Sequence, residues 1–280
     1  MLECKDITKV YGRKTAVDHI SLQIEPGRIY ALLGPNGSGK TTLMKMAMGI
    51  VKPTSGGFYY QGQPVGVDSR KEIAYMSTEP YFYTWMTVKD AGKYYADFFD
   101  DFSMEEYERL LERMELTPDM KTKSLSSGMM AKLKIAVTMA RKAKIYLLDE
   151  PLNGIDLLAR DQIMESVLEA TGPDVALVLS SHLVDELEKI VDTAIFIKES
   201  HLVQVCQVEE LRIKEGRSLV DKEFTRGQVP SDRWYLSTRF PLLFNYGVCH
   251  CIFFKWIFFH LNTSPLPERT TAISSFCLWE

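Results

Sequence analysis

The chain has 280 residues, of which 46% are hydrophobic and 25% are charged, a composition typical of a globular protein. This length can hold one large domain or two small ones with a substantial buried core. The formal net charge of -4 gives no basic footprint and argues against nucleic acid as the main partner.

The first residues and the cysteines both favour a cytoplasmic location. Glu3, Lys5 and Asp6 place charges where a secretory leader needs an apolar segment. The cysteines are odd in number and form no disulfide framework; they are Cys4, Cys206, Cys249, Cys251 and Cys277. A metal site beginning at Cys-His-Cys in 249–251 is disfavoured, because no second ligand pair follows at a usable spacing.

The opening of the chain predicts an antiparallel sheet. A strand is expected at 2–7, and apolar and polar residues alternate over 20–25 before the Pro26-Gly27 turn. Tyr11 lies in the connection between them. An exposed tyrosine there is either incidental or available to stack on a purine base.

Residues 33–43 predict a phosphate-binding loop, because they contain the pattern G-x-x-x-x-G-K-[ST] between an apolar strand at 29–33 and a helix at 42–48. Its glycines let backbone N–H groups converge on a phosphate, and the helix start adds its positive dipole end. The candidate nucleotide-binding residues are Gly34, Pro35, Asn36, Gly37, Ser38, Gly39, Lys40, Thr41 and Thr42. Lys40 would bind the outer phosphates and Thr41 a magnesium ion. The alternative is an ordinary glycine-rich turn before a core helix.

The middle of the chain changes from strands to helices. After a turn at 53–57, strands are expected at 58–60 and 73–76. Residues 87–116 are helical in pattern, with a capping-type start of a second helix at 103–106. Another helix begins near Ser126 and Ser127, for which capping alone is a sufficient explanation. Together they predict an all-helical insertion over about 87–140.

Two acidic residues and a histidine follow predicted buried strands. Asp149 and Glu150 follow the apolar run 145–148, and Ser180-Ser181-His182 follows a strand at 175–179. Ligands gather at the carboxyl ends of parallel strands, so these side chains should lie beside the phosphate loop. Asp149 then suits magnesium and Glu150 suits polarising an attacking water. Solvated acids at a strand end and a structural histidine are the alternatives.

The remaining elements complete an α/β pattern. A turn at 153–156 precedes a helix at 157–170. Further helices are expected at 183–191 and 208–214, with a hairpin of strands 194–197 and 202–205 between them.

From about residue 2 to residue 211, the chain resembles the ATP-binding cassette (ABC) ATPases, the nucleotide-binding subunits of ABC transporters. The phosphate loop alone indicates only some NTPase. Residues 125–129, Leu-Ser-Ser-Gly-Met, resemble the L-S-G-G-Q signature of this family alone. The resemblance implies an α/β P-loop NTPase fold: a mixed, largely parallel core sheet, an N-terminal antiparallel β subdomain and a small α-helical insertion.

The resemblance also implies a role for individual residues. Tyr11 would stack on adenine, Lys40 and Glu150 would act in catalysis, and His182 would contact the γ-phosphate. Magnesium would be held through Thr41, Asp149 and Thr78. Ser126 and Gly128 would touch ATP held by the opposite subunit, and Asp156 belongs to the loop that crosses the interface. Two chains, in a homodimer or a heterodimer, would close head to tail on two ATP molecules. They would drive a separate membrane permease, because the matching region has no apolar segment long enough to span a membrane. The chain itself would be peripheral, on the inner face of the cell membrane.

The sequence departs from the family pattern at two places. Thr78 stands where a glutamine normally senses magnesium and the attacking water, which predicts slowed or differently coupled hydrolysis. Met129 replaces the signature glutamine and Ser127 a glycine, whereas Ser126 and Gly128 are kept.

The composition changes after about residue 226, and the predicted domains are 1–215 and a C-terminal extension, 216–280. The aromatic stretch 240–261 is a weak membrane span, since Lys255 costs about 3 kcal/mol near the bilayer centre and each apolar residue returns only about 0.5 kcal/mol. An interfacial or permease-contacting segment, a poorly folded tail and the product of a reading-frame change are the alternatives.

Two other function classes fit less well. A soluble, non-transport ABC protein usually carries two cassettes or a long coiled coil, and neither a second phosphate loop nor sustained heptads occur here. A regulatory subunit with weak hydrolysis fits Thr78 but has no need of Glu150.

Overall fold

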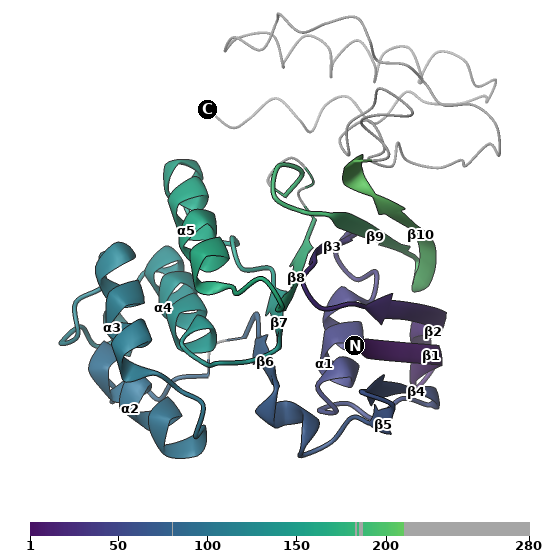
Figure 1. Cartoon of the computed structure of the whole chain (residues 1–280), viewed down its shortest axis with the longest axis horizontal. Helices are drawn as coiled ribbons and strands as arrows, with labels where there is room; N and C mark the ends of the chain where they lie inside the picture. The colour runs from purple at the N-terminus through teal and green to yellow at the C-terminus, as the bar shows by residue number, and fades with distance from the viewer. Residues whose placement is uncertain (80, 183, 185–186, 210–280) are drawn as a thin grey trace, which may run out of the picture. The chain divides into compact units, whose positions relative to one another are not determined.

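The computed structural model describes residues 1–79, 81–182, 184 and 187–209, and it places them in two sheets with helices on both faces of the larger one (Figure 1). The smaller sheet is antiparallel, with order β2-β1-β4-β5. Its strands are β1 (Leu2–Tyr11), β2 (Lys14–Ile24), β4 (Ser55–Tyr60) and β5 (Gln63–Pro64). The predicted antiparallel opening is therefore confirmed. Gly12, with a φ of 59°, lies in the turn between β1 and β2, so Tyr11 is the last residue of its strand and about half exposed.

The larger sheet is mixed, with order β10-β9-β3-β8-β7-β6. Its strands are β3 (Ile29–Leu33), β6 (Ile73–Met76), β7 (Ile145–Asp149), β8 (Ala176–Ser181), β9 (Thr193–Lys198) and β10 (His201–Gln207). All pairings from β9 to β6 are parallel, and only β10 runs antiparallel to β9. Glu199 and Ser200 form the turn of that predicted hairpin with positive φ at both positions, as a two-residue turn between twisted strands requires.

The two faces of the larger sheet are covered by different layers, because successive strand residues point to opposite sides. On β8, Ala176 and Val178 pack with α1 (Lys40–Ala47) and the N-terminal sheet. Leu177 and Leu179 pack into a second core with the helices of the insertion and α5 (Leu157–Ala170). Figure 1 shows α1 and the N-terminal strands on one side of β3, β7 and β8, and α2 to α5 on the other. The predicted phosphate loop, between β3 and α1, thus rests on a sheet that is buried on both faces.

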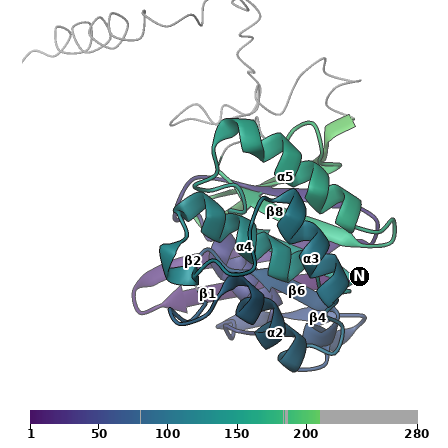
Figure 2. The same cartoon turned by 90° about the vertical axis from the view of Figure 1, so that its left-hand side faces the viewer.

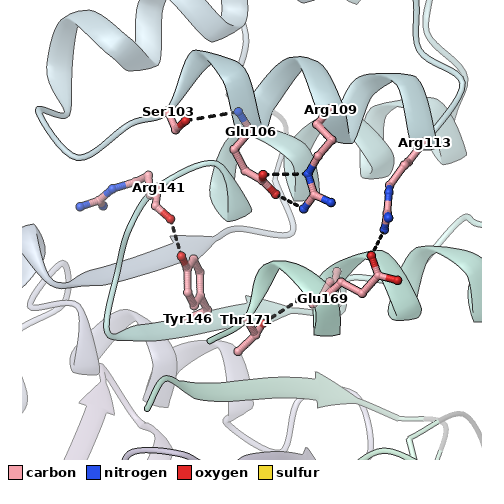
Figure 3. Close-up of polar contacts among 9 residues, drawn as sticks. Ser103, Glu106, Arg109, Arg113, Arg141, Tyr146, Glu169 and Thr171 are labelled. Atoms are coloured by element: carbon pink, nitrogen blue, oxygen red, sulfur yellow. Dashed lines mark hydrogen bonds and ion pairs between the residues drawn. The ribbon is translucent and has the colours of Figure 1, made fainter. Parts of the chain in front are cut away.

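The helical layer consists of α2 (Val88–Phe98), α3 (Met104–Arg113), α4 (Ser127–Met139) and α5, which Figure 2 shows in front of the sheets. The first three lie between β6 and β7 in the chain, as the predicted insertion requires. Thr87 and Asp90 form a capping box at α2, and Ser103 caps α3 by accepting from the N–H of Glu106 at 3.2 Å. An ion pair between Arg113 and Glu169 joins α3 to α5 (Figure 3).

The helix predicted at 183–191 is not formed as a regular helix in the residues of this span that the structure describes, 184 and 187–191, although the N–H groups of Glu188 and Val191 donate four residues back, to Val184 O and Leu187 O, at 3.2 Å each. Residues 187–190 form turns, with the N–H of Ile190 donating to Leu187 O at 3.0 Å. Directly after this segment, Asp192 is bonded to β3: its N–H donates to Ile29 O at 2.9 Å, and its Oδ2 accepts from the Ile29 N–H at 2.8 Å.

The predictions for the chain beyond residue 209 are not tested. Residues 208 and 209 of the helix predicted at 208–214 are helical, and the rest of that helix, the Cys-His-Cys stretch and the extension 216–280 lie outside the described residues. In the part of the chain that the structure describes, no helix combines the length and the apolar character needed to cross a membrane.

Candidate active site

Four strand ends meet at one edge of the larger sheet. In the parallel register, Leu33 pairs with Ser181, Asp149 with Ser180, and Met76 with Leu148. The phosphate loop, the acidic pair, His182 and the segment that carries Thr78 therefore leave the sheet at the same edge. The convergence predicted from the strand ends is confirmed, and it is the place where an open α/β sheet binds ligands.

The phosphate loop needs glycine at both of its ends. Gly34 has a φ of 156°, and a Cβ added there would lie 2.1 Å from Ile197 O. Gly39 has a φ of 109°, and a Cβ there would lie 2.2 Å from Ala16 O. Because α1 begins at Lys40, directly after Gly39, the free N–H groups of its first turn lie next to the loop.

The ammonium of Lys40 lies within the loop. Lys40 is only 5% exposed, and its Nζ donates to Gly34 O at 2.7 Å and to Pro35 O at 3.3 Å. The same Nζ lies 3.4 Å from Oε1 of Glu150. A buried cation is therefore fixed between the glycine loop and the acidic strand end, where it can meet a negatively charged ligand.

A cavity of about 390 Å³ opens above these groups. Of the predicted residues, Tyr11, Asn36, Gly37, Gly39, Lys40, Thr41, Thr42, Thr78, Glu150 and His182 line it. Gly34, Pro35, Ser38 and Asp149 are not among its described lining residues, although they support the loop and the acidic strand end. Ser38 is 3% exposed, and its Oγ has no hydrogen-bond partner within the described structure. A buried hydroxyl without a partner in a loop of this kind is an available ligand group.

Ser180 links the two acids. Its hydroxyl donates to Oδ1 of Asp149 at 2.6 Å and accepts from the N–H of Glu150 at 2.8 Å. Glu150 has a φ of 49°, a left-handed conformation that is uncommon for a side-chain-bearing residue. The bond from its N–H to Ser180 therefore helps to hold Glu150 in a strained turn toward the cavity.

Glu150 lies between a cation and an imidazole. Its Oε2 is 2.9 Å from Nδ1 of His182, opposite the Oε1 contact with Lys40. The carboxylate is largely buried, whereas the His182 side chain is about one-third exposed toward the cavity. Glu150 is thus oriented by two neighbours, which is the arrangement expected of a group that positions a reacting water.

Comparisons with known proteins agree with this geometry. The family profile described as ABC transporter matches residues 17–153. YcbN of Bacillus subtilis (strain 168), described as an uncharacterized ABC transporter ATP-binding protein, is 32% identical over 252 residues, covering 87% of this chain and 82% of the relative. The chain belongs to the ABC transporter ATP-binding proteins. SrtF of Streptococcus pyogenes, a lantibiotic transport ATP-binding protein, is 30% identical to this ABC ATPase over 72% of the chain and 89% of the relative.

The fold of this ABC ATPase also has a solved counterpart. The dimeric structure of a post-hydrolysis state of the ATP-binding cassette MJ0796, bound to ADP and Pi, matches it with a TM-score of 0.66. The match covers 74% of this chain and 98% of the other, at 22% identity, and it concerns the fold. The resemblance seen in the sequence is confirmed: the protein is an ATP-binding and ATP-hydrolysing subunit of an ABC transporter.

The residues of the ABC ATPase that are expected at the interface between two copies lie at two helix starts: the signature stretch at α4, and Asp156 at α5. Ser126 caps α4 by accepting from the N–H of Met129 at 3.2 Å, and Asp156 caps α5 by accepting from Ala159 at 3.0 Å. A Cβ added to Gly128 would lie 2.9 Å from Gly154 O, so the two helix starts are in close contact. The predicted capping by Ser126 is confirmed. Of the described residues, neither Ser126 nor Gly128 nor Asp156 lines the chain's own cavity.

Several residues of the ABC ATPase site were missed at the level of sequence. Lys14, Ala16 and Asn153 line the cavity, and Ser180 bonds both acids. Asn153 belongs to the same predicted turn as Asp156, so its place in that turn could have identified it as a site residue. No local pattern singled out Lys14 or Ala16, because they reach the loop only through the pairing of β2 in the N-terminal sheet.

Proposed function

We propose that the cavity is the ATP site and that this chain's residues divide the work of hydrolysis as follows. The loop from Gly34 to Thr42 wraps the phosphates, and Lys40 binds the outer phosphates. Tyr11, at the cavity rim, stacks on the adenine base. Glu150 orients the attacking water, and His182 contacts the γ-phosphate. The observation that carries the proposal is the buried carboxylate of Glu150, held 3.4 Å from Lys40 and 2.9 Å from His182 on the cavity wall.

The donor groups beside the loop fit Mg²⁺. Thr41 lines the cavity with a hydroxyl, and Asp149 carries a carboxylate at the end of β7, which β8 separates from β3, so the ligands are the oxygen atoms that this cation prefers. Oδ1 of Asp149 accepts from Ser180, whereas Oδ2 has only a contact of 3.5 Å with the Tyr75 hydroxyl. We assign the magnesium to Thr41 and Asp149, with Thr78 nearby. When bound, the ion neutralises charge on the β- and γ-phosphate oxygens.

We further propose that two copies close head to tail, with Ser126 and Gly128 of one facing the nucleotide of the other. The exposed apolar side chains beside them support this arrangement. Leu157 and Leu158, directly after Asp156, are 73% and 92% exposed at the start of α5. A second copy would cover these side chains, which are unusual on the surface of an isolated helix start.

The test of the site and of the dimer uses Glu150→Gln in the full-length chain, with Glu105→Gln on the exposed surface of α3 as the matched control. We expect Glu150→Gln to lose ATP hydrolysis but keep ATP binding, and to form a dimer with ATP and magnesium in light scattering. Glu105→Gln should behave as the wild type. A Glu150→Gln protein that hydrolyses ATP normally, or that stays monomeric with its membrane partner present, contradicts the proposal.

The membrane partner is proposed to be a separate permease subunit, with this chain peripheral on the inner face of the membrane. A connected set of exposed aromatic side chains follows the Thr78 segment: Trp85 stacks on Tyr83 with ring centroids 5.8 Å apart, Tyr83 meets Tyr94 edge-on, and Tyr94 contacts Phe98. Tyr83, Trp85 and Phe98 are each more than half exposed. Exposed aromatic patches of this kind mark protein interfaces.

Replacement of Trp85 by Ala tests the permease contact. We expect it to weaken co-purification with the permease while ATP binding by the isolated chain is unchanged. Val67→Ala, on a residue that is 74% exposed and lies outside this aromatic set, is the control and should leave both properties intact. Full co-purification of the Trp85→Ala protein would place the permease elsewhere.

A further inference from the structure

Helix α4 contains a buried lysine that the site described above does not use. Lys134 is 6% exposed and belongs to the stretch 133–139 of α4, in which every residue is buried. A lysine is rarely buried to this extent unless its ammonium is fully bonded. Burial lowers the pKa of Lys134, and the negative charge of Asp149 opposes this shift. The buried ammonium of Lys134 therefore needs hydrogen-bond acceptors within the fold.

The ammonium of Lys134 binds the segment that carries Thr78. Its Nζ donates to Ser77 O and to Thr78 O, both at 2.8 Å. These carbonyls follow the end of β6, at the sheet edge where the other site residues emerge. Thr78 itself lines the nucleotide cavity. One side chain of α4 thus holds the backbone of a residue that lines the cavity.

The same helix begins with the signature residues. Ser126 caps α4, and Lys134 lies two turns further along it. Because a helix moves as a rigid element, a displacement of its start would be carried through Lys134 to the carbonyls of residues 77 and 78.

We propose that Lys134 is a positioning residue for ATP hydrolysis, which holds the Thr78 backbone so that the Thr78 side chain stays on the cavity wall and follows the position of the α4 start. The inference rests on the proposed role of the cavity as the ATP site. It assigns to Lys134 no contact with the nucleotide, and the effect of Lys134 passes through Thr78.

The test compares Lys134→Met with Lys132→Met, which removes the same charge from a half-buried position on the same helix. In the full-length chain, we expect Lys134→Met to lower kcat for ATP by roughly 10- to 100-fold, as small misplacements of positioning groups do. The KM for ATP should change by less than about twofold, since the phosphate loop is untouched. Lys132→Met should match the wild type in both values. An unchanged kcat, or an equal loss in both variants, overturns the proposal.

A double-mutant cycle with Thr78→Ala separates positioning from general stability. If Lys134 acts through Thr78, adding Lys134→Met to Thr78→Ala should lower kcat by less than about twofold further, whereas independent effects multiply. If the effects of Lys134→Met and Thr78→Ala on kcat multiply, Lys134 has only a structural role and the proposal fails. Should Lys134→Met not fold, Lys134→Gln, which removes the charge but keeps an NH2 donor on a shorter side chain, is measured against the same criteria. Activity of the wild type and its loss in Glu150→Gln test the ATP site separately, so a failure of that site is distinguishable from a failure of Lys134.

Discussion

The hydroxyl of Ser180 donates a 2.6 Å hydrogen bond to Oδ1 of Asp149, and both residues are completely buried. The pair exists because β7 and β8 are parallel neighbours in which Asp149 is directly opposite Ser180. The same hydroxyl accepts from the N–H of Glu150 at 2.8 Å. One serine therefore sets the carboxylate assigned to magnesium and the backbone of the residue assigned to the attacking water.

Replacing Ser180 by Ala should impair both stability and hydrolysis. The buried Asp149 oxygen loses its donor, which costs about 1–3 kcal/mol of unfolding free energy, measurable by urea denaturation. We expect kcat to fall because Glu150 is no longer held. Ser166→Ala is the control: Ser166 is also buried, at 3% exposed, but its hydroxyl only donates back to Gln162 O within α5. Wild-type kcat in Ser180→Ala would show that Ser180 does not set the acidic pair.

Replacing Thr78 by Gln should increase the rate of hydrolysis. The longer amide can reach the magnesium and water positions from the cavity wall, where threonine offers only a short hydroxyl. We expect a several-fold higher kcat in the purified dimer with its permease. Thr84→Gln, in an exposed part of the same loop, is the matched control and should leave kcat unchanged. A Thr78→Gln rate equal to that of the wild type would remove Thr78 from the catalytic argument.

Local patterns predicted much of the fold and of the site. The phosphate loop, the acidic pair at the end of β7, the caps at Ser103 and Ser126 and the β9–β10 hairpin all depend on residues close together in sequence. Glu150 and His182 then lie together because side chains at the carboxyl ends of parallel strands share one edge of the sheet.

Contacts that depend on register between distant segments were not predictable in this way. Ser180 meets Asp149 only because two strands align, and Lys134 meets residues 77 and 78 only through tertiary packing. Turns at 187–190 stand where the pattern at 183–191 predicts a helix, and the next residue but one, Asp192, binds the backbone of Ile29, far earlier in the chain. A periodic pattern contains no information about such a partner.

Arg141 should be a principal determinant of stability. Its guanidinium is 5% exposed and binds Asp101 at 3.1 Å, together with the carbonyls of Arg70 and Lys71, and it lies 4.0 Å from the centre of the Phe99 ring. It therefore joins the helical layer to the segment before β6. We expect Arg141→Met to lower the free energy of unfolding by about 3 kcal/mol, because several buried acceptors lose their donor.

Urea denaturation measures this effect, and Arg109→Met provides the control. Arg109 pairs with Glu106 on the partly exposed surface of α3, so its replacement should cost less than about 1 kcal/mol (Figure 3). Equal losses in the two variants would mean that Arg141 contributes no more than a surface ion pair.

A pH-sensitive pair lies on the N-terminal sheet, away from the site. His19 Nδ1 is 2.8 Å from Asp6 Oδ1, and this hydrogen bond, with the charge of Asp6, raises the pKa of His19 above its ordinary value of 6.5. The pair's stabilisation is fully present below the unfolded pKa and is lost as the pH rises through the folded pKa. Because both side chains are largely exposed, we expect only a small effect on stability.

An NMR titration of the imidazole measures this pKa directly. The His19 midpoint should lie above 6.5 in the wild type and return close to that value in Asp6→Asn. Asp18 makes a weaker contribution to the same pKa, from a contact of 3.8 Å, so Asp18→Asn should lower the midpoint less. A graded response, Asp6 before Asp18, identifies the hydrogen bond as the main cause; equal shifts in the two variants would identify a general field of negative charge instead.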